Sequence, residues 1–230
     1  VAAYHKTNAL SRMMADRSLQ RKSETAWLRS QKIFDEKFWN ATAQTYANAF
    51  SEQGEQIQEL SPWIALPAIF QLGDSTHRYA SLQRLCRSDI STDWGVRSLS
   101  EQSRYFDGLN YNYGAVWPFL TGYVSLGQFN MGLNRQAFSN LKSLAAQTFD
   151  NNLGCVPELY SGRLHTWPAE AVAQQGFSSS AVALAMVRGW LGFCLDLPHR
   201  KLCFEPRVLP GYESLSLKHP ALKLEQDFRR

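Results

Sequence analysis

One short loop places a carboxylate among small and aromatic residues. Residues 156–162 read Val-Pro-Glu-Leu-Tyr-Ser-Gly, with Glu158 at the centre and helical patterns before and after. An ionised carboxylate in such a loop can take a proton from a water molecule, which is general-base chemistry. A glutamate in a solvent-exposed loop with no chemical task has the same local sequence, so the loop alone leaves both interpretations open.

Two earlier segments combine flat aromatic rings with polar groups. They read Asp-Trp-Gly-Val-Arg-Ser-Leu-Ser over 93–100 and Tyr-Asn-Tyr-Gly-Ala-Val-Trp-Pro over 111–118. Loops held by a rigid scaffold often carry function, and rings with polar tips suit a ligand that has flat faces and hydroxyls. Our candidate ligand-binding residues are Trp94, Arg97, Tyr111, Asn112, Trp117 and, after the carboxylate, Trp167.

Each candidate also has a structural interpretation that the sequence leaves open. Trp117 suits a core position at a helix start, and Arg97 could hold its own loop instead of contacting hydroxyls. Asp107 precedes a glycine, as in many turns, although burial beside its aromatic neighbours would make it a second acid. His165 lies in the Glu158 loop and could contact a ligand.

The composition is typical of a folded globular protein that is long enough to bury a core. Of its 230 residues, 44% are hydrophobic and 19% charged. The net charge of +4 comes from scattered Lys and Arg, which argues against nucleic-acid binding. The four cysteines and five histidines lack metal-ligand spacing, so we expect no metal site. No apolar run approaches the ~18 residues needed to span a bilayer.

Hydrophobic residues recur at helical spacing along most of the chain, which predicts an all-α fold. Ser61 and Pro62 form a typical helix start, Pro67 should kink that helix, and Asp74 or Ser75 suits the cap of the next. Several helices are apolar on more than one side, as the inner ring of a two-layered helical barrel requires. We expect helices at about 2–20, 24–39, 61–72, 76–88, 115–131, 135–149 and 178–195.

The last part of the chain changes character. Short alternating runs at 201–204, 214–218 and 222–226 predict strands, and 45–50 also looks extended. We therefore divide the chain into barrel helices over 1–197 and the start of a β accessory segment over 198–230. Because half of a helical barrel would expose a broad apolar face, we expect these helices to pair with the remainder of their own polypeptide or with another copy of the chain.

Five segments, taken in order, resemble one protein family. They are DWGVRSLS (93–100), YNYGAVWPFLTGY (111–123), VPELYSG (156–162), FSSSAVALAMVRGWLG (177–192) and LCFEPRVLPGYESLSLKH (202–219). Their order is similar to that in the C-terminal half of bacterial proteins related to amylo-α-1,6-glucosidase, the glucosidase domain of glycogen debranching enzymes. The resemblance covers nearly the whole chain.

The resemblance implies an (α/α)6 toroid of twelve helices with its active site in a funnel of loops at one end. It implies hydrolysis of α-linked glucosides in an oligosaccharide or polysaccharide, with inversion and without a cofactor. Glu158 matches the general base, and the general acid is expected in the loop before the sixth helix, upstream of Val1. The relatives carry His at Asn112 and in the Gln174–Gln175 pair, which predicts altered sugar contacts.

Two other functions fit the same sequence. One is a carbohydrate-binding toroid that keeps the aromatic funnel but has no turnover. The other is a related (α/α)6 glycosidase that prefers a different sugar, such as trehalose or a rhamnoside.

Overall fold

Helices are the main regular elements of the computed structural model, which describes residues 1–230 except 197–200, 208, 210, 213, 220–223 and 230. A 3-10 turn, η1 (Pro62–Ala65), leads into α3, and a π-helix, η2 (Leu184–Trp190), extends α7. The α-helices are α1 (Ala2–Met13), α2 (Arg17–Phe38), α3 (Leu66–Phe70), α4 (Ser75–Arg84), α5 (Pro118–Asn130), α6 (Asn134–Gln147) and α7 (Gly176–Ala183).

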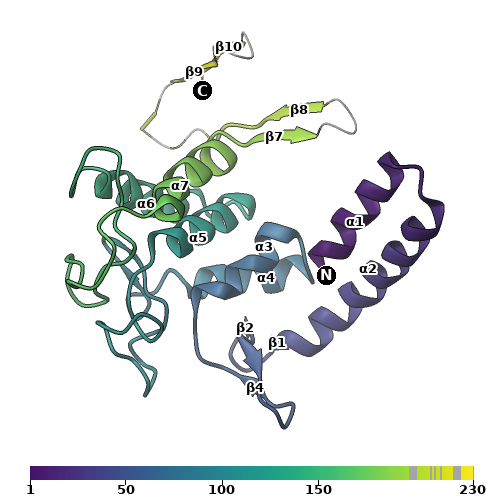
Figure 1. Ribbon diagram of the computed structural model, residues 1–230, viewed down its shortest axis with the longest axis horizontal. Helices are drawn as coiled ribbons and strands as arrows, with labels where there is room; N and C mark the ends of the chain where they lie inside the picture. The colour runs from purple at the N-terminus through teal and green to yellow at the C-terminus, as the bar shows by residue number, and fades with distance from the viewer. Residues whose placement is uncertain (197–200, 208, 210, 213, 220–223, 230) are drawn as a thin grey trace.

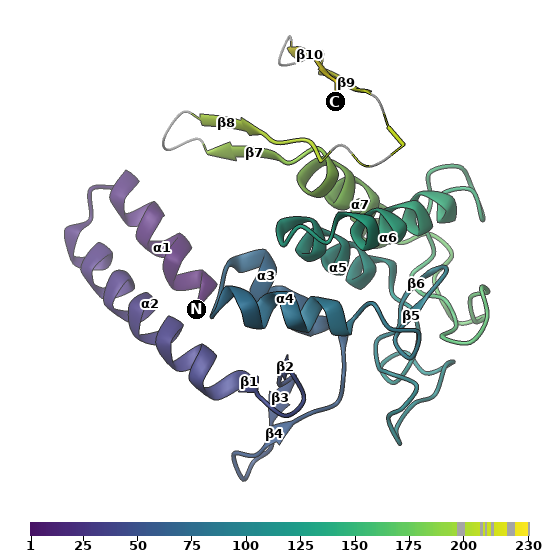
Figure 2. The same ribbon diagram turned by 180° about the vertical axis from the view of Figure 1, so that it is seen from behind.

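The helices follow one another across the molecule as neighbouring pairs, α1 with α2, α3 with α4 and α5 with α6 (Figure 1). Figure 2 shows the same pairs from behind, so that α1 and α2 lie on the left. Helix α5 is the centre of this arrangement, because it packs against α3, α6, α7 and η2. The described helices therefore match a part of a helical toroid, in which an apolar helix is covered on several sides.

The two larger core clusters both include residues of α5. One brings Leu82 of α4 and Leu85, which follows α4, together with Val124 of α5. The other brings Phe129 of α5 against Leu144 of α6 and the start of η2. Ten of the thirteen residues of α5 are buried, which explains why its sequence is apolar all round.

The boundary between the first two helices differs from the sequence prediction. We expected one helix to reach residue 20 and the next to begin near 24, but α1 ends at Met13 and α2 begins at Arg17. Ala15 turns the chain in the left-handed region with φ 55°, and the Asp16 carboxylate then caps α2 by accepting the Leu19 N–H. No glycine or proline marks this break.

Two further helix ends were predicted wrongly. The helix expected from 115 begins only at Pro118, because Val116 is extended and bridges Arg97 and Tyr160. The last helix ends at Trp190 instead of 195, and Gly192 (φ 60°) leads into a strand. Pro67, by contrast, lies where the 3-10 turn becomes α3, and Asp74 caps α4 through the Thr76 N–H, both as predicted.

The strands are short and pair locally. Strand β7 (Phe193–Asp196), which the sequence analysis missed, pairs with β8 (Lys201–Phe204), so this hairpin spans the boundary that we expected at 198. Strands β9 (Ser214–His219) and β10 (Leu224–Arg229) also pair antiparallel; of the predicted run 222–226, residues 222–223 lie outside the described residues. The others are β1 (Trp39–Asn40), β2 (Thr45–Tyr46), β3 (Ala49–Phe50), β4 (Gln56–Ile57), β5 (Ser91–Thr92) and β6 (Gly95–Val96).

No helix in the described part of the chain is long and apolar enough to cross a membrane.

A buried ion pair ties helix α4 to the loop that precedes α5. Asp89 accepts two hydrogen bonds from Arg84, at 2.9 and 2.7 Å, and one from the Ser100 hydroxyl at 2.5 Å. Burial alone would raise the pKa of the Asp89 carboxyl, but the hydrogen bonds from Arg84 and Ser100 outweigh it and lower that pKa below its usual value. The ionised carboxylate is therefore the form that the fold stabilises.

We predict that Asp89→Asn lowers the free energy of unfolding by about 3 kcal/mol near neutral pH, because the Arg84 charge loses its partner. The folded-state pKa of Asp89 is below the unfolded one, so this stabilisation is present above about pH 4 and is lost as the pH falls through the folded-state value. Urea denaturation of wild type and variant should show a gap that narrows on acidification. A gap that stays constant would contradict the assignment; exposed Asp93→Asn is the control.

Candidate active site

Three long connections each lead into the N-terminal end of a core helix. They span residues 39–61 before η1 and α3, 85–117 before α5, and 148–175 before α7. The second and third lie together at the left of Figure 1 and on the right of Figure 2. Residues from the first two connections, together with residues of α5 and α7, line one cavity of about 630 Å³.

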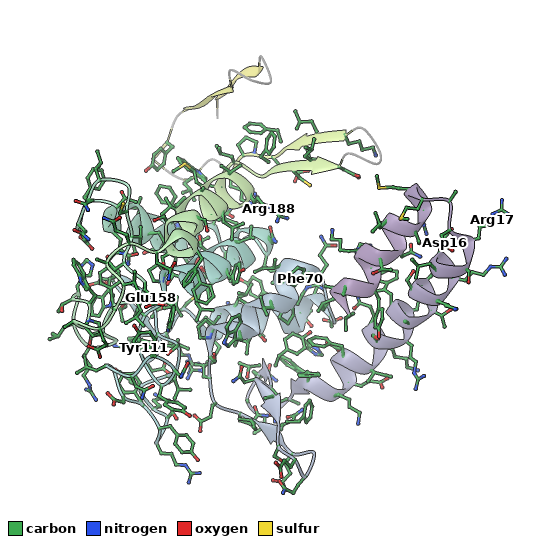
Figure 3. The ribbon with its side chains drawn as sticks, in the orientation of Figure 1. Asp16, Arg17, Phe70, Tyr111, Glu158 and Arg188 are labelled. Carbon is green, nitrogen blue, oxygen red and sulfur yellow. The ribbon has the colours of Figure 1, made fainter. Side chains whose placement is uncertain are left out.

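Glu158 is fixed at both its backbone and its side chain. Its N–H donates to the Val172 carbonyl at 2.8 Å, and its own carbonyl accepts the Ser178 hydroxyl at 3.1 Å. Its Oε2 accepts the Tyr111 hydroxyl at 2.9 Å and the Val172 N–H at 3.5 Å. The side chain is half-buried, and Figure 3 shows Glu158 and Tyr111 close together among the loops.

The residues next to Glu158 in the sequence that carry hydrogen-bond donors, Tyr160, Ser161 and Arg163, do not donate to its carboxylate. The Tyr160 hydroxyl donates instead to Asp150 at 2.8 Å. The Ser161 hydroxyl accepts the Arg163 N–H at 3.1 Å, and the Arg163 guanidinium lies over the Phe106 ring. The partner that the structure supplies comes from a different loop, 47 positions away in the sequence.

A two-bond backbone bridge holds the Glu158 loop against the segment before α5. Val116 N–H donates to the Tyr160 carbonyl at 2.9 Å, and Tyr160 N–H donates to the Val116 carbonyl at 2.8 Å. Both side chains are fully buried. Burial, and then the hydrogen bond to Asp150, raise the pKa of Tyr160, so its hydroxyl remains protonated. The bridge therefore fixes Glu158, two positions before Tyr160.

Glycines let the loops approach each other more closely than side chains would allow. Gly162 N–H donates to the Gly108 carbonyl at 2.7 Å. A Cβ at Gly162 would lie 2.1 Å from the Gly114 carbonyl oxygen, and one at Gly114 would lie 2.5 Å from the Asp107 carbonyl oxygen. The glycines of the two sequence motifs are therefore needed for backbone contact between loops.

Trp94 and Arg97 support the Glu158 loop from behind. The Trp94 indole N–H donates to the Ser161 carbonyl at 2.9 Å, and the Arg97 Nε–H donates to the Gly162 carbonyl at 2.7 Å. Arg97 also donates to the Ser88 carbonyl at 2.6 Å, and burial lowers its pKa. Neither side chain lines the cavity, so for Arg97 the structure favours the loop-holding interpretation over contact with hydroxyls.

Tyr111, Asn112 and Trp117 line the cavity. The Trp117 indole N–H donates to the Tyr111 carbonyl at 2.7 Å, and the two rings meet edge to face with centroids 5.5 Å apart. Burial, and then the hydrogen bond to Glu158 and the charge of that carboxylate, raise the pKa of Tyr111. Its phenol therefore stays protonated and keeps donating to Glu158.

The remaining candidates lie beside this cavity. Trp167 packs edge to face on Tyr160, with centroids 5.9 Å apart, and joins the small core under the Glu158 loop. His165 pairs with Asp150 at 3.0 Å. Asp107 is exposed and accepts the Leu109 N–H at 3.1 Å, which is the turn interpretation; the exposed position contradicts the hypothesis of an acid created by burial.

Sequence reasoning missed much of the cavity wall. Phe119 and Phe177 join Trp117 in an aromatic group, with ring centroids 5.2 to 6.2 Å apart. The sequence offered a signal for both residues: Phe119 directly follows the segment 111–118, and Phe177 stands just before the last predicted helix. Other lining residues that the sequence analysis did not propose are Asn48, Glu59, Ser61, Trp63, Tyr105 and Tyr113.

A protein-family comparison shows the family to which the chain belongs. The model of the mannosylglycerate hydrolase MGH1-like glycoside hydrolase domain matches residues 1–163, a range that includes Glu158. The chain belongs to this family. It is therefore a glycoside hydrolase domain, and the loops around Glu158 are its candidate active site.

Solved structures show the same fold. The GH63 mannosylglycerate hydrolase of Thermus thermophilus in complex with glucose has a TM-score of 0.64 at 20% identity, over 81% of this chain and 43% of that one. Its complex with Tris and D-glycerate gives a TM-score of 0.60 at 20% identity, over 81% and 43%. A sialidase gives 0.72 at 13% identity, over 93% of this chain and 20% of that one.

These comparisons support the resemblance at the level of the glycosidase and its fold. They do not point to amylo-α-1,6-glucosidase or to glycogen debranching in particular. The MGH1-like domain described here spans less than half the length of the mannosylglycerate hydrolase structures that it matches. No curated protein sequence matches the chain.

The support that Arg97 gives to the MGH1-like site can be tested directly. Arg97→Met leaves the Gly162 and Ser88 carbonyls without their donor, so we predict a loss of about 3 kcal/mol in the free energy of unfolding. Hydrogen exchange measured by mass spectrometry should also become faster over residues 158–163. Arg87→Met is the control, since Arg87 is exposed and its side chain has no hydrogen bond within the described part of the chain. Unchanged exchange at the loop would contradict the support role.

Proposed function

We propose that this domain hydrolyses an α-glucosidic bond with inversion, with Glu158 as the general base. The observation that carries the proposal is the half-buried Glu158 carboxylate, which accepts the hydroxyl of Tyr111. Tyr111 lines the aromatic cavity, whereas Glu158 stands behind it and is not itself a lining residue. A general base takes a proton from water, and the hydrogen bond from Tyr111 fixes the carboxylate that would do so.

The two carboxylate oxygens of Glu158 have different surroundings. Both side-chain hydrogen bonds, from Tyr111 and from the Val172 amide, go to Oε2. Within the described residues Oε1 has no partner, and it is the atom that would accept a proton from water. The water oxygen then attacks the anomeric carbon, and a second carboxyl group protonates the departing oxygen as the glycosidic bond breaks.

We propose that the second carboxyl group comes from residues upstream of Val1, as the resemblance implies. Inverting enzymes hold their two carboxyl groups about 6.5–9.5 Å apart, which leaves room for the water. We further propose that these helices function together with further helices of the same polypeptide, since the matched mannosylglycerate hydrolase structures are more than twice as long as the matched part. Residues that such helices would cover include Leu66, Ile69 and Phe70, which line a second cavity between α3, α5 and α7.

For the substrate, we propose an α-linked glucoside, with Trp117, Tyr111 and Asn112 around the innermost sugar ring. Trp117 offers a flat face for the ring, and Tyr111 and Asn112 offer hydroxyl and amide groups to the sugar. The motif resemblance supports a debranching-type oligosaccharide. The likeness to mannosylglycerate hydrolases favours a second candidate, a small glycoside of a single hexose.

Glu158→Gln removes the proposed base and keeps the size of the side chain. We predict that kcat for hydrolysis of α-glucosides falls by at least about 10³-fold, since the amide cannot take the proton of water. NMR of the fresh product should show the β anomer for the wild type. Retention of configuration would contradict inversion, and oligosaccharide binding by a wild type without any turnover would favour a carbohydrate-binding protein.

Tyr111→Phe removes only the hydroxyl that holds Glu158 Oε2. We predict that kcat/KM falls roughly tenfold or more, because a hydrogen bond to a charged group contributes about 1.5–3 kcal/mol. The thermal unfolding midpoint should change little. Tyr79→Phe is the control: it removes the same atom from an exposed side chain of helix α4 and should retain wild-type activity. Equal activity of the Tyr111 variant and the wild type would contradict the positioning role.

A further inference from the structure

The cavity lined by Tyr111, the partner of Glu158, carries a negative charge and no positive one among its described lining residues. Its described wall is mostly aromatic and amide in character, and its one ionisable acid is Glu59. No lysine, arginine or histidine is among the described residues that line it. Asn112, which carries an uncharged amide, lies on this wall.

Glu59 is placed to meet a ligand. It lies in the connection between β4 and η1, in the first of the three segments that enter core helices. Its side chain is half-buried and has no hydrogen bond or ion pair to any described residue, unlike Asp89 and Asp35, whose carboxylates are fully engaged. A half-buried carboxylate without a protein partner has its acceptor atoms available for donors on a ligand.

Two arginines come from the loop that supplies part of this wall, but neither lines the cavity. Arg97 is buried and bound to the carbonyls of Gly162 and Ser88. Arg104 is exposed; its guanidinium lies over the ring of Tyr105, a residue of the wall, and donates to the Tyr105 hydroxyl. The Glu158 carboxylate adds to the negative potential at this wall, because it is hydrogen-bonded to the lining residue Tyr111.

We propose that Glu59 is a specificity-determining residue that accepts hydrogen bonds from sugar or aglycone hydroxyls and makes the cleft select uncharged glycosides over those with an anionic aglycone. This inference rests on the proposed function of the Glu158 site and deepens it. A neutral polyol supplies O–H donors for the free carboxylate. A carboxylate on the aglycone would supply only acceptors and would be repelled in a partly desolvated cleft.

A matched pair of compounds tests the proposal: 2-O-α-glucosylglycerol and 2-O-α-glucosylglycerate, which differ in one CH₂OH against one COO⁻. With the complete natural polypeptide, we expect the wild type to have the higher kcat/KM for the glycerol compound. Glu59→Gln should lower the ratio of the two kcat/KM values roughly tenfold, because it removes one unit charge near the aglycone. Added salt should lower the wild-type ratio as well.

Glu55→Gln is the matched control, since it removes the same charge from an exposed residue four positions earlier that does not line the cavity; its ratio should equal that of the wild type. Binding of both compounds to Glu158→Gln, measured by calorimetry, separates this inference from the proposed function. A preference for the glycerol compound in binding supports the inference even if the wild type has no turnover. Three outcomes would each overturn it. They are equal binding of both compounds, a ratio of kcat/KM values that is unchanged in Glu59→Gln, and loss of all turnover in that variant, as expected for a general acid.

Discussion

The candidate site depends on the pair of backbone hydrogen bonds between Val116 and Tyr160. This bridge is the one place where the segment leading into α5 and the Glu158 loop share a regular strand-like pairing within the described residues. It excludes water, because both side chains are completely buried. On one side of it the chain continues into Trp117 and α5, and on the other it leads back to Glu158. A shift of the pairing by one residue would turn these side chains to the opposite face.

Around this bridge, the polar residues of the loops divide into two groups. Tyr111, Asn112 and Trp117 face the cavity, whereas Trp94 and Arg97 bind carbonyls on the far side of the Glu158 loop. The second group explains how irregular segments can hold a carboxylate in place without helices or sheets of their own. Loop carbonyls that secondary structure does not satisfy are instead paired with buried side-chain donors.

The sequence predicted the helices well, because their apolar residues repeat at helical spacing wherever one face is buried. It predicted their ends poorly where the break has no usual marker. Ala15 adopts a left-handed conformation without being glycine, and Val116 is extended because it forms bridges with Arg97 and Tyr160, which are distant in the sequence. The same limit applies to the site. Glu158, Tyr111 and Trp117 could be proposed from residue type, but the contact between Tyr111 and Glu158 joins positions that no local pattern connects.

The glycines at the loop junction have a consequence for how this protein acquires activity. Gly108, Gly114 and Gly162 meet backbone to backbone. We expect the loops that carry them to become ordered only after α5 and α6 have packed. Closing such long loops costs entropy that local helix formation does not. During refolding, helical signal should therefore return before the loop junction forms, so that the helices become native before the Glu158 carboxylate reaches its position.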